Sequence, residues 1–293
     1  MVTGLSSEGG VVRRISTLPL LLAAAVAVAG LAGCSGGTQE APAPSAPAAD
    51  APLPKYATLA DLGAATAAQQ KIDRTAKITL NGGLAGRSQS GLTGDGSLRF
   101  DDTGASMQIT QRIQAGGGTP QELELVLLPD DAFLRPPAGS SGFPAGKTWL
   151  RIRPNSTDPG STQFNHMVQT IRDNADPTKS FAQFGDAISI VDTAEEQLDG
   201  LRTMRYKLRV DLAKAAERQP DPGLKKSLQD SVQGGLNTLE YTLWVDAQNR
   251  LARVLVDQPL PQNQGTFSLD ARYRDWGLPV QIDPPPADQV LER

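Results

Sequence analysis

The stretch Met204-Arg205-Tyr206-Lys207-Leu208-Arg209-Val210-Asp211-Leu212 carries the clearest fold signal in this chain. Every second residue is apolar, and every residue between them is charged. Successive side chains of a strand point to opposite faces, so this segment predicts a strand with one dry face and one wet face. Such strands are typical of an antiparallel sheet that is covered on one side only.

The same period of two recurs on both sides of this stretch, between turn residues such as Gly94-Asp95-Gly96 and Asp246-Ala247-Gln248-Asn249. About ten such strands predict one large, curved antiparallel sheet. The other apolar residues that mark strands are Ile78 and Leu80; Leu98 and Phe100; Met107, Ile109 and Ile113; Leu123, Leu125 and Leu127; Trp149 to Arg153; Leu239, Tyr241, Leu243 and Val245; Ala252, Val254 and Val256; and Phe267, Leu269, Ala271 and Tyr273.

Helical spacing of apolar residues appears in four segments. They are Tyr56 to Lys71, Thr162 to Asn174, Pro177 to Phe184 and Ala213 to Gln233. Their apolar stripes need a partner surface, and the dry face of the sheet is the only large one that the sequence offers. The predicted fold class is therefore α+β, a large curved antiparallel sheet (a half-barrel) with helices covering its concave face.

The N-terminal segment has the three parts of a secretory signal, with Arg13-Arg14, an apolar run and small residues before Cys34. Leu31-Ala32-Gly33-Cys34 matches the bacterial lipobox, in which this cysteine receives a diacylglycerol carrying chains such as palmitate. The alternatives are an ordinary signal peptide and a transmembrane helix. However, the run from Leu18 to Leu31 is shorter than the roughly 18–20 residues that span a bilayer. We therefore expect residues 1–33 to be a lipoprotein signal peptide, with export by either Sec or Tat.

Residues 34–54 are expected to form the lipidated cysteine and an extended tether, because prolines alternate with small residues there. Residues 55–293 are expected to form a single domain that folds without the tether. With Cys34 acylated, no cysteine remains for a disulfide, since the chain contains 1 cysteine. The domain must then be stabilised by its core.

The sequence offers little catalytic or metal-binding chemistry. It contains 1 histidine, His166, within an expected helix beside apolar residues, so the usual zinc sites cannot be built. No G-x-S-x-G elbow or phosphate-binding glycine loop is present. The formal charge of −4 argues against nucleic-acid binding. We expect no enzyme activity, no metal and no cofactor.

Three features together resemble the LppX/LprG family of actinobacterial envelope lipoproteins, which share a fold with the carriers LolA and LolB. The first is the order of lipobox, Pro/Ala tether, short helix and opening strand Thr75 to Asn81. The second is Tyr241 to Asp246 running through a turn into Arg250 to Val254, similar to the family's W-[IV]-D…L-x-R turn. The third is Tyr273 to Pro285, similar to the family's terminal W-G-x-P-V-x-I-x-x-P. The resemblance implies a pocket for acylated lipids or lipoglycans between the sheet and its helices.

The leading hypothesis is a lipoprotein, anchored through Cys34 on the extracytoplasmic face of the cytoplasmic membrane, that binds and transports lipids, with an envelope transporter as a candidate partner. The alternative is an envelope lipoprotein that binds a partner protein and has a filled core, because a core and a pocket give the same alternation. Exposed Trp244 and Trp276 would favour that alternative. The residues expected to line the lipid site are Ile78, Leu80, Leu98, Phe100, Met107, Ile109, Leu125, Met204, Tyr206, Leu208, Val210, Tyr241 and Leu243.

Overall fold

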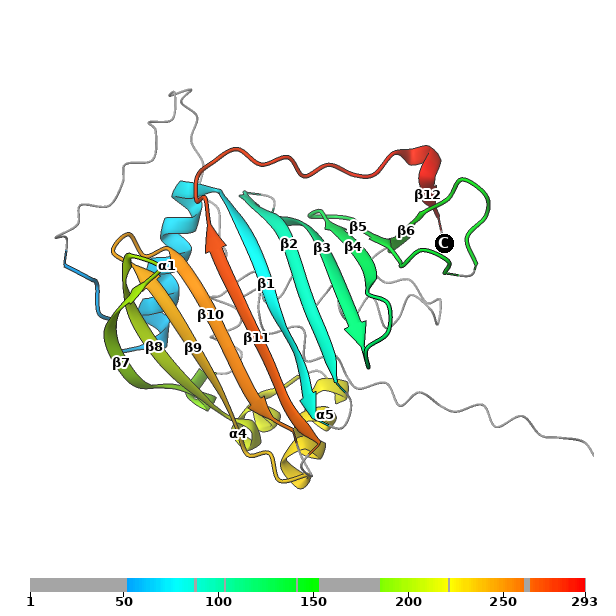
Figure 1. Cartoon of the computed structure of the whole chain (residues 1–293). Helices are drawn as coiled ribbons and strands as arrows, with labels where there is room; N and C mark the ends of the chain where they lie inside the picture. The colour runs from blue at the N-terminus through cyan, green and yellow to red at the C-terminus, as the bar shows by residue number, and fades with distance from the viewer. Residues whose placement is uncertain are drawn as a thin grey trace, which may run out of the picture.

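The computed structural model describes residues 52–292 except 87–88, 103, 141, 153–184, 221 and 261–263. A single 12-stranded sheet dominates it, in the spatial order β12-β6-β5-β4-β3-β2-β1-β11-β10-β9-β8-β7 (Figure 1). The strands are β1 (Thr75–Gly86), β2 (Ser90–Asp101), β3 (Gly104–Ala115), β4 (Gln121–Leu127), β5 (Ala132–Arg135), β6 (Trp149–Ile152), β7 (Ile188–Leu198), β8 (Leu201–Asp211), β9 (Thr238–Asp246), β10 (Leu251–Pro259), β11 (Gly265–Arg274) and β12 (Val290–Leu291). All neighbours are antiparallel except β12 and β6, which confirms the expected large, mostly antiparallel sheet.

Strand β8 has the two faces that its alternation predicts. Its residues Tyr206 and Leu208 pair with Leu243 and Tyr241 of β9 on the dry face. On the outer face, Arg205 binds carboxylates of β7, and Arg209 lies 3.0 Å from Glu240. The charged residues of the pattern therefore form cross-strand ion pairs, which contribute modestly to stability in such exposed positions.

Two pairs of glycines lie inside strands, and one of them, Gly94 and Gly96, was expected to form a turn. Strand β1 continues through Gly82-Gly83, and β2 continues through Gly94-Asp95-Gly96. A Cβ at Gly82 would stand 2.3 Å from the carbonyl oxygen of Ser268 in β11. A Cβ at Gly96 would stand 2.6 Å from the carbonyl oxygen of Gln108 in β3. These glycines allow a close approach of neighbouring backbones rather than a turn.

Helix α1 (Leu59–Asp73) packs on the dry face of the sheet. It begins three residues later than expected because Thr58 caps it, its Oγ1 accepting a hydrogen bond from the N–H of Asp61 at 3.1 Å. Its sheet-facing stripe includes Leu59, Leu62 and the buried polar residues Thr66 and Gln70. This helix holds one side of the candidate site described below.

The helical segment expected at Ala213 to Gln233 is two helices, α4 (Leu212–Arg218) and α5 (Pro222–Gln233). The break follows from Pro220, since a residue before proline is disfavoured in the helical region and Gln219 is extended. Both helices lie at one end of the sheet (Figure 1), where Ala215 packs with Val210 and Leu239 in a small cluster of its own. The other two expected helices and His166 lie outside the described residues.

The sheet is covered on both faces around β4, β5 and β6, which corrects the expectation of one covered side. On the outer face, Val126, Phe133 and Trp149 pack against Ile282 and Val290 of the C-terminal segment. That segment runs from the end of β11 to β12, the red trace in Figure 1. The family-like terminal motif is therefore used as a covering for the sheet.

Candidate functional site

The residues predicted to line a lipid site gather on the dry face, but they pack against one another. All except Val210 belong to the main core cluster or pack directly against it, together with Leu59 and Leu62 of α1. Tyr206 is 0% and Ile78 is 1% exposed. Val210 lies in the smaller cluster beside α4. A ligand-binding role for these residues stays a prediction.

Two tyrosines in this core remain protonated. Burial raises the pKa of Tyr241 to about 12, and burial also raises the pKa of Tyr273. An acid or base that exchanges protons near neutral pH needs a pKa close to that pH. Neither phenol meets this requirement, so both act as neutral groups.

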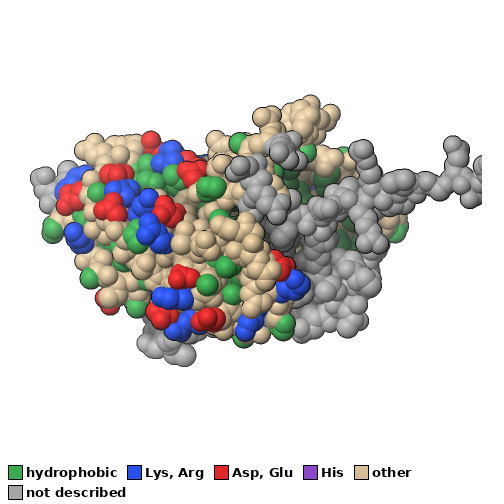
Figure 2. All heavy atoms as spheres, turned by 90° about the horizontal axis from the view of Figure 1, so that it is seen from below, with side chains coloured by type: hydrophobic (Ala, Val, Ile, Leu, Met, Phe, Trp, Pro, Cys, Tyr) green, Lys and Arg blue, Asp and Glu red, His purple; other side chains and the backbone are tan. Residues whose placement is uncertain are grey.

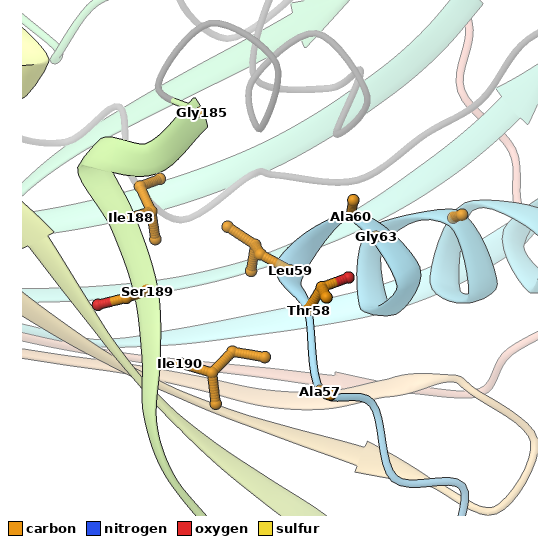
Figure 3. Close-up of a pocket in the computed structure, with 10 residues that line it drawn as sticks. Ala57, Thr58, Leu59, Ala60, Gly63, Gly185, Ile188, Ser189 and Ile190 are labelled. Carbon is orange, nitrogen blue, oxygen red and sulfur yellow. The ribbon is translucent and has the colours of Figure 1, made fainter.

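A cavity of about 640 Å³ lies beside this core, between the start of α1 and the start of β7 (Figure 3). Its lining residues are Ala57, Thr58, Leu59, Ala60, Gly63, Ala64, Gly185, Ile188, Ser189 and Ile190. None of the predicted lining residues is among them. The helical spacing of Leu59 was recognised in the sequence, but β7 was not recognised as a strand, so its Ile188 and Ile190 were missed.

The described lining of the cavity carries no charged side chain. Its hydroxyl from Thr58 is already engaged, since it accepts from the N–H of Asp61 and donates to the Asp61 carboxylate at 2.7 Å. Ser189 is the other hydroxyl and is exposed. The cavity can therefore accept hydrocarbon, and its described residues bring together no nucleophile and base.

The described contacts of the domain begin inside the expected tether. Leu53 is 9% exposed and belongs to the main core. The Tyr206 hydroxyl donates to the carbonyl oxygen of Pro54 at 3.1 Å and accepts from the N–H of Tyr56 at 3.1 Å. The Tyr56 hydroxyl in turn donates to Asn249 Oδ1 at 2.8 Å. Leu53 and Pro54 therefore contact the domain, although both lie in the segment expected to be the tether.

The turn after β9 forms a buried polar cluster with α1. The Asp246 carboxylate accepts the N–H groups of Gln248 and Arg250, each at 2.8 Å. Burial raises the pKa of Asp246. The two N–H groups lower this pKa, and the nearby charge of Asp73 raises it. Arg250 forms a two-pronged pair with Asp73, Nε to Oδ2 at 2.8 Å and Nη2 to Oδ1 at 2.6 Å. This pair fixes the C-terminal end of α1 to the turn.

Both tryptophans of the family-like motifs are covered. The Trp244 ring is 6% exposed, lies under the Arg253 guanidinium at 4.7 Å and donates its Nε1–H to Glu196 at 2.9 Å. The Trp276 ring is stacked with Phe100 and with Tyr273, at centroid distances of 6.2 Å each. These contacts favour packing roles for both residues over an exposed partner site.

Cys34 lies outside the described residues, so its acylation stays a prediction. Within residues 52–292 as described, no three His, Cys, Asp or Glu side chains are grouped to hold a metal ion. None of the described helices is long and apolar enough to cross a membrane.

No family model and no curated protein matches this sequence. Among solved structures, the chain is similar to a DUF1329 family protein from Desulfovibrio piger, with a TM-score of 0.32 and 13% identity over 76% of this chain and 93% of that one. It is also similar to LprF from Mycobacterium bovis, with a TM-score of 0.40 and 15% identity over 78% of this chain and 96% of that one.

Proposed function

We propose that this protein is a membrane-anchored envelope lipoprotein that binds acylated lipids or lipoglycans and carries them. The observation that carries this proposal is the cavity between α1 and β7, whose described lining is uncharged and largely apolar. Such a surface suits an acyl chain, because burying about sixteen carbons gains on the order of 12 kcal/mol relative to water at ~0.8 kcal/mol per CH₂.

The energetics suit a carrier rather than a permanent store. A lipid starts in a membrane, where its chains are already out of water, so transfer into an apolar cavity is close to balanced. A near-balanced transfer allows both loading and release. We further propose that Cys34 anchors the protein on the extracytoplasmic face of the cytoplasmic membrane, where an envelope transporter can supply or accept the lipid.

The second candidate is an envelope lipoprotein that binds a partner protein. The tight packing of the predicted lining residues favours it, since Leu98 is 2% and Ile109 is 3% exposed within one core. Against it, the face seen from below in Figure 2 intermixes acidic, basic and apolar side chains, with no continuous apolar patch among the described residues. Large apolar patches are the usual mark of a stable protein interface.

The cavity-filling variant Ala64→Phe tests the lipid hypothesis, with Ala68→Phe as its matched control. Both alanines are exposed on α1 one turn apart, but only Ala64 lines the cavity. We would compare the mature chain carrying Cys34→Ser with these variants, using native mass spectrometry, extraction of co-purifying lipid and a fluorescent fatty acid. Ala64→Phe should lower bound lipid and probe affinity, while Ala68→Phe should change neither.

The result that contradicts the lipid hypothesis is equally definite. If the parent chain carries no lipid and binds no fatty acid, or if both phenylalanine variants bind like the parent, the cavity is not a lipid site. The partner-binding candidate would then take its place.

A further inference from the structure

The segment Leu53–Thr58, which we name the N-terminal strap, serves two parts of the molecule at once. Its first residue, Leu53, packs in the main core, and its last two residues, Ala57 and Thr58, form part of the cavity wall. Figure 3 shows this wall, with Ala57 and Thr58 leading into α1 opposite Ile190 of β7. The strap is also the part of the domain that continues toward Cys34.

A single hydroxyl holds the middle of the strap. Tyr206 is 0% exposed, and its hydroxyl contacts the strap on both sides, with Pro54 as acceptor and Tyr56 as donor at 3.1 Å each. Burial raises the pKa of Tyr206, so this hydroxyl keeps the proton that it donates. The side chain of Tyr56 adds a third hydrogen bond, to Asn249.

The opposite wall of the cavity is formed by β7, which is attached to the sheet along one edge. Among the described strands, β7 is the last of the sheet and pairs with β8 alone. Its register shifts between Ile190 and Asp192, directly after the residues that line the cavity. Moving the strap away from β7 therefore breaks the hydrogen bonds to Tyr206 and Asn249 and takes Leu53 out of the core, but it leaves every strand pair of the sheet intact.

We propose that the N-terminal strap is a latch at one wall of the cavity, which Tyr206 holds in place and whose release widens the cavity so that a ligand enters or leaves. This inference rests on the proposed function, because a latch regulates a site only if that site is occupied. Along the chain, the strap lies between Cys34 and the cavity wall. Tyr206 therefore holds the segment that connects the membrane tether to the lipid site.

Tyr206→Phe tests the latch, with Thr203→Val as the matched control. Thr203 is also on β8 and 0% exposed, and its hydroxyl donates to the carbonyl oxygen of Glu196 at 3.0 Å, away from the strap. Both variants lose buried hydroxyl bonds from the same strand. Tyr56→Phe, which loses only the Asn249 bond, is a milder variant in case Tyr206→Phe does not fold.

Two readouts are needed, both in the mature chain carrying Cys34→Ser. The first is the rate at which a thiol reagent labels Leu59→Cys, a buried position of the cavity wall, and it requires no ligand. The second is the dissociation rate of a fluorescent fatty acid. Tyr206→Phe removes two neutral hydrogen bonds, so both rates should rise between about 5-fold and about 100-fold. Tyr56→Phe should give a smaller rise, and Thr203→Val should give none.

Three outcomes separate the possibilities. Equal labelling rates in Tyr206→Phe and Thr203→Val would overturn the latch, because opening would then be general loosening. If Tyr206→Phe speeds labelling but leaves the dissociation rate of the fatty acid unchanged, the latch does not control ligand exchange. If the parent chain binds no fatty acid, the proposed function fails instead, and the labelling rates alone decide whether Tyr206 controls access to the cavity.

Discussion

The pair Asp73–Arg250 offers the sharpest test of how this domain is held together. The Asp73 side chain is 5% exposed and that of Arg250 is 14%, and two hydrogen bonds of 2.8 and 2.6 Å join them. Removing one partner of a buried pair typically costs 3–5 kcal/mol, because the other charge is left without compensation. Arg250 keeps some contact with water, so we expect Asp73→Asn to cost about 3 kcal/mol. That is roughly 6–12 °C in Tm for a domain of this size.

Urea unfolding of Asp73→Asn, Arg250→Met and the double variant measures this cost. The midpoint should shift without a change in the slope m, and the double variant should cost less than the sum of the single ones. Lys226–Asp230 is the control, an exposed pair on α5 whose side chains are 73% and 56% exposed. Asp230→Asn should cost no more than about 0.5 kcal/mol. If Asp73→Asn costs as little as Asp230→Asn, the buried cluster does not stabilise the fold as argued.

Four further predictions follow from other parts of the chain. Cys34→Ala should move the protein from the membrane fraction to the soluble fraction, and unchanged partition into detergent would contradict the anchor. A chain beginning at Lys55 should unfold at a lower temperature than one beginning at Pro52, because it lacks the packed side chain of Leu53; equal melting temperatures would show that Leu53 contributes nothing. Leu208→Trp should destabilise the domain by about 1–3 kcal/mol through overpacking without weakening fatty-acid binding. The raised pKa of Asp246 means that the folded state binds its proton more tightly, so stability should fall as pH rises from the ordinary aspartate pKa of about 3.9 through the raised value. Asp246→Asn should flatten that part of the pH profile in urea titrations.

The strands that the sequence predicts best are those with one wet and one dry face. In β8 burial alternates from Met204 to Asp211 as the sequence does, because Arg205, Lys207 and Arg209 of its outer face form ion pairs at the surface. Strand β7 escaped prediction because it is an edge strand without a fully buried residue and its register shifts near Val191. Strand β5 has 4 residues, Ala132–Arg135, too few to show any period.

The candidate site was harder to predict than the fold, for a physical reason. Apolar alternation predicts which residues are removed from water. It does not tell whether a neighbouring side chain or a ligand covers them. Except for Val210, the predicted lining residues pack in one core with one another and with Leu59 and Leu62 of α1. The cavity instead lies where small residues such as Ala60 and Gly63 meet the unrecognised strand β7, and small residues carry almost no hydropathy signal.

The two edge strands of the sheet determine whether copies of this molecule can associate edge to edge. At one end, β12 is only 2 residues long, which offers little backbone for a further strand. At the other end, β7 carries a bulge and the carboxylates of Asp192, Glu195 and Glu196. Short, bulged or charged edge strands are the features by which sheet proteins avoid edge-to-edge aggregation. A protein with a broad open sheet can thus avoid aggregation even where many copies are crowded together.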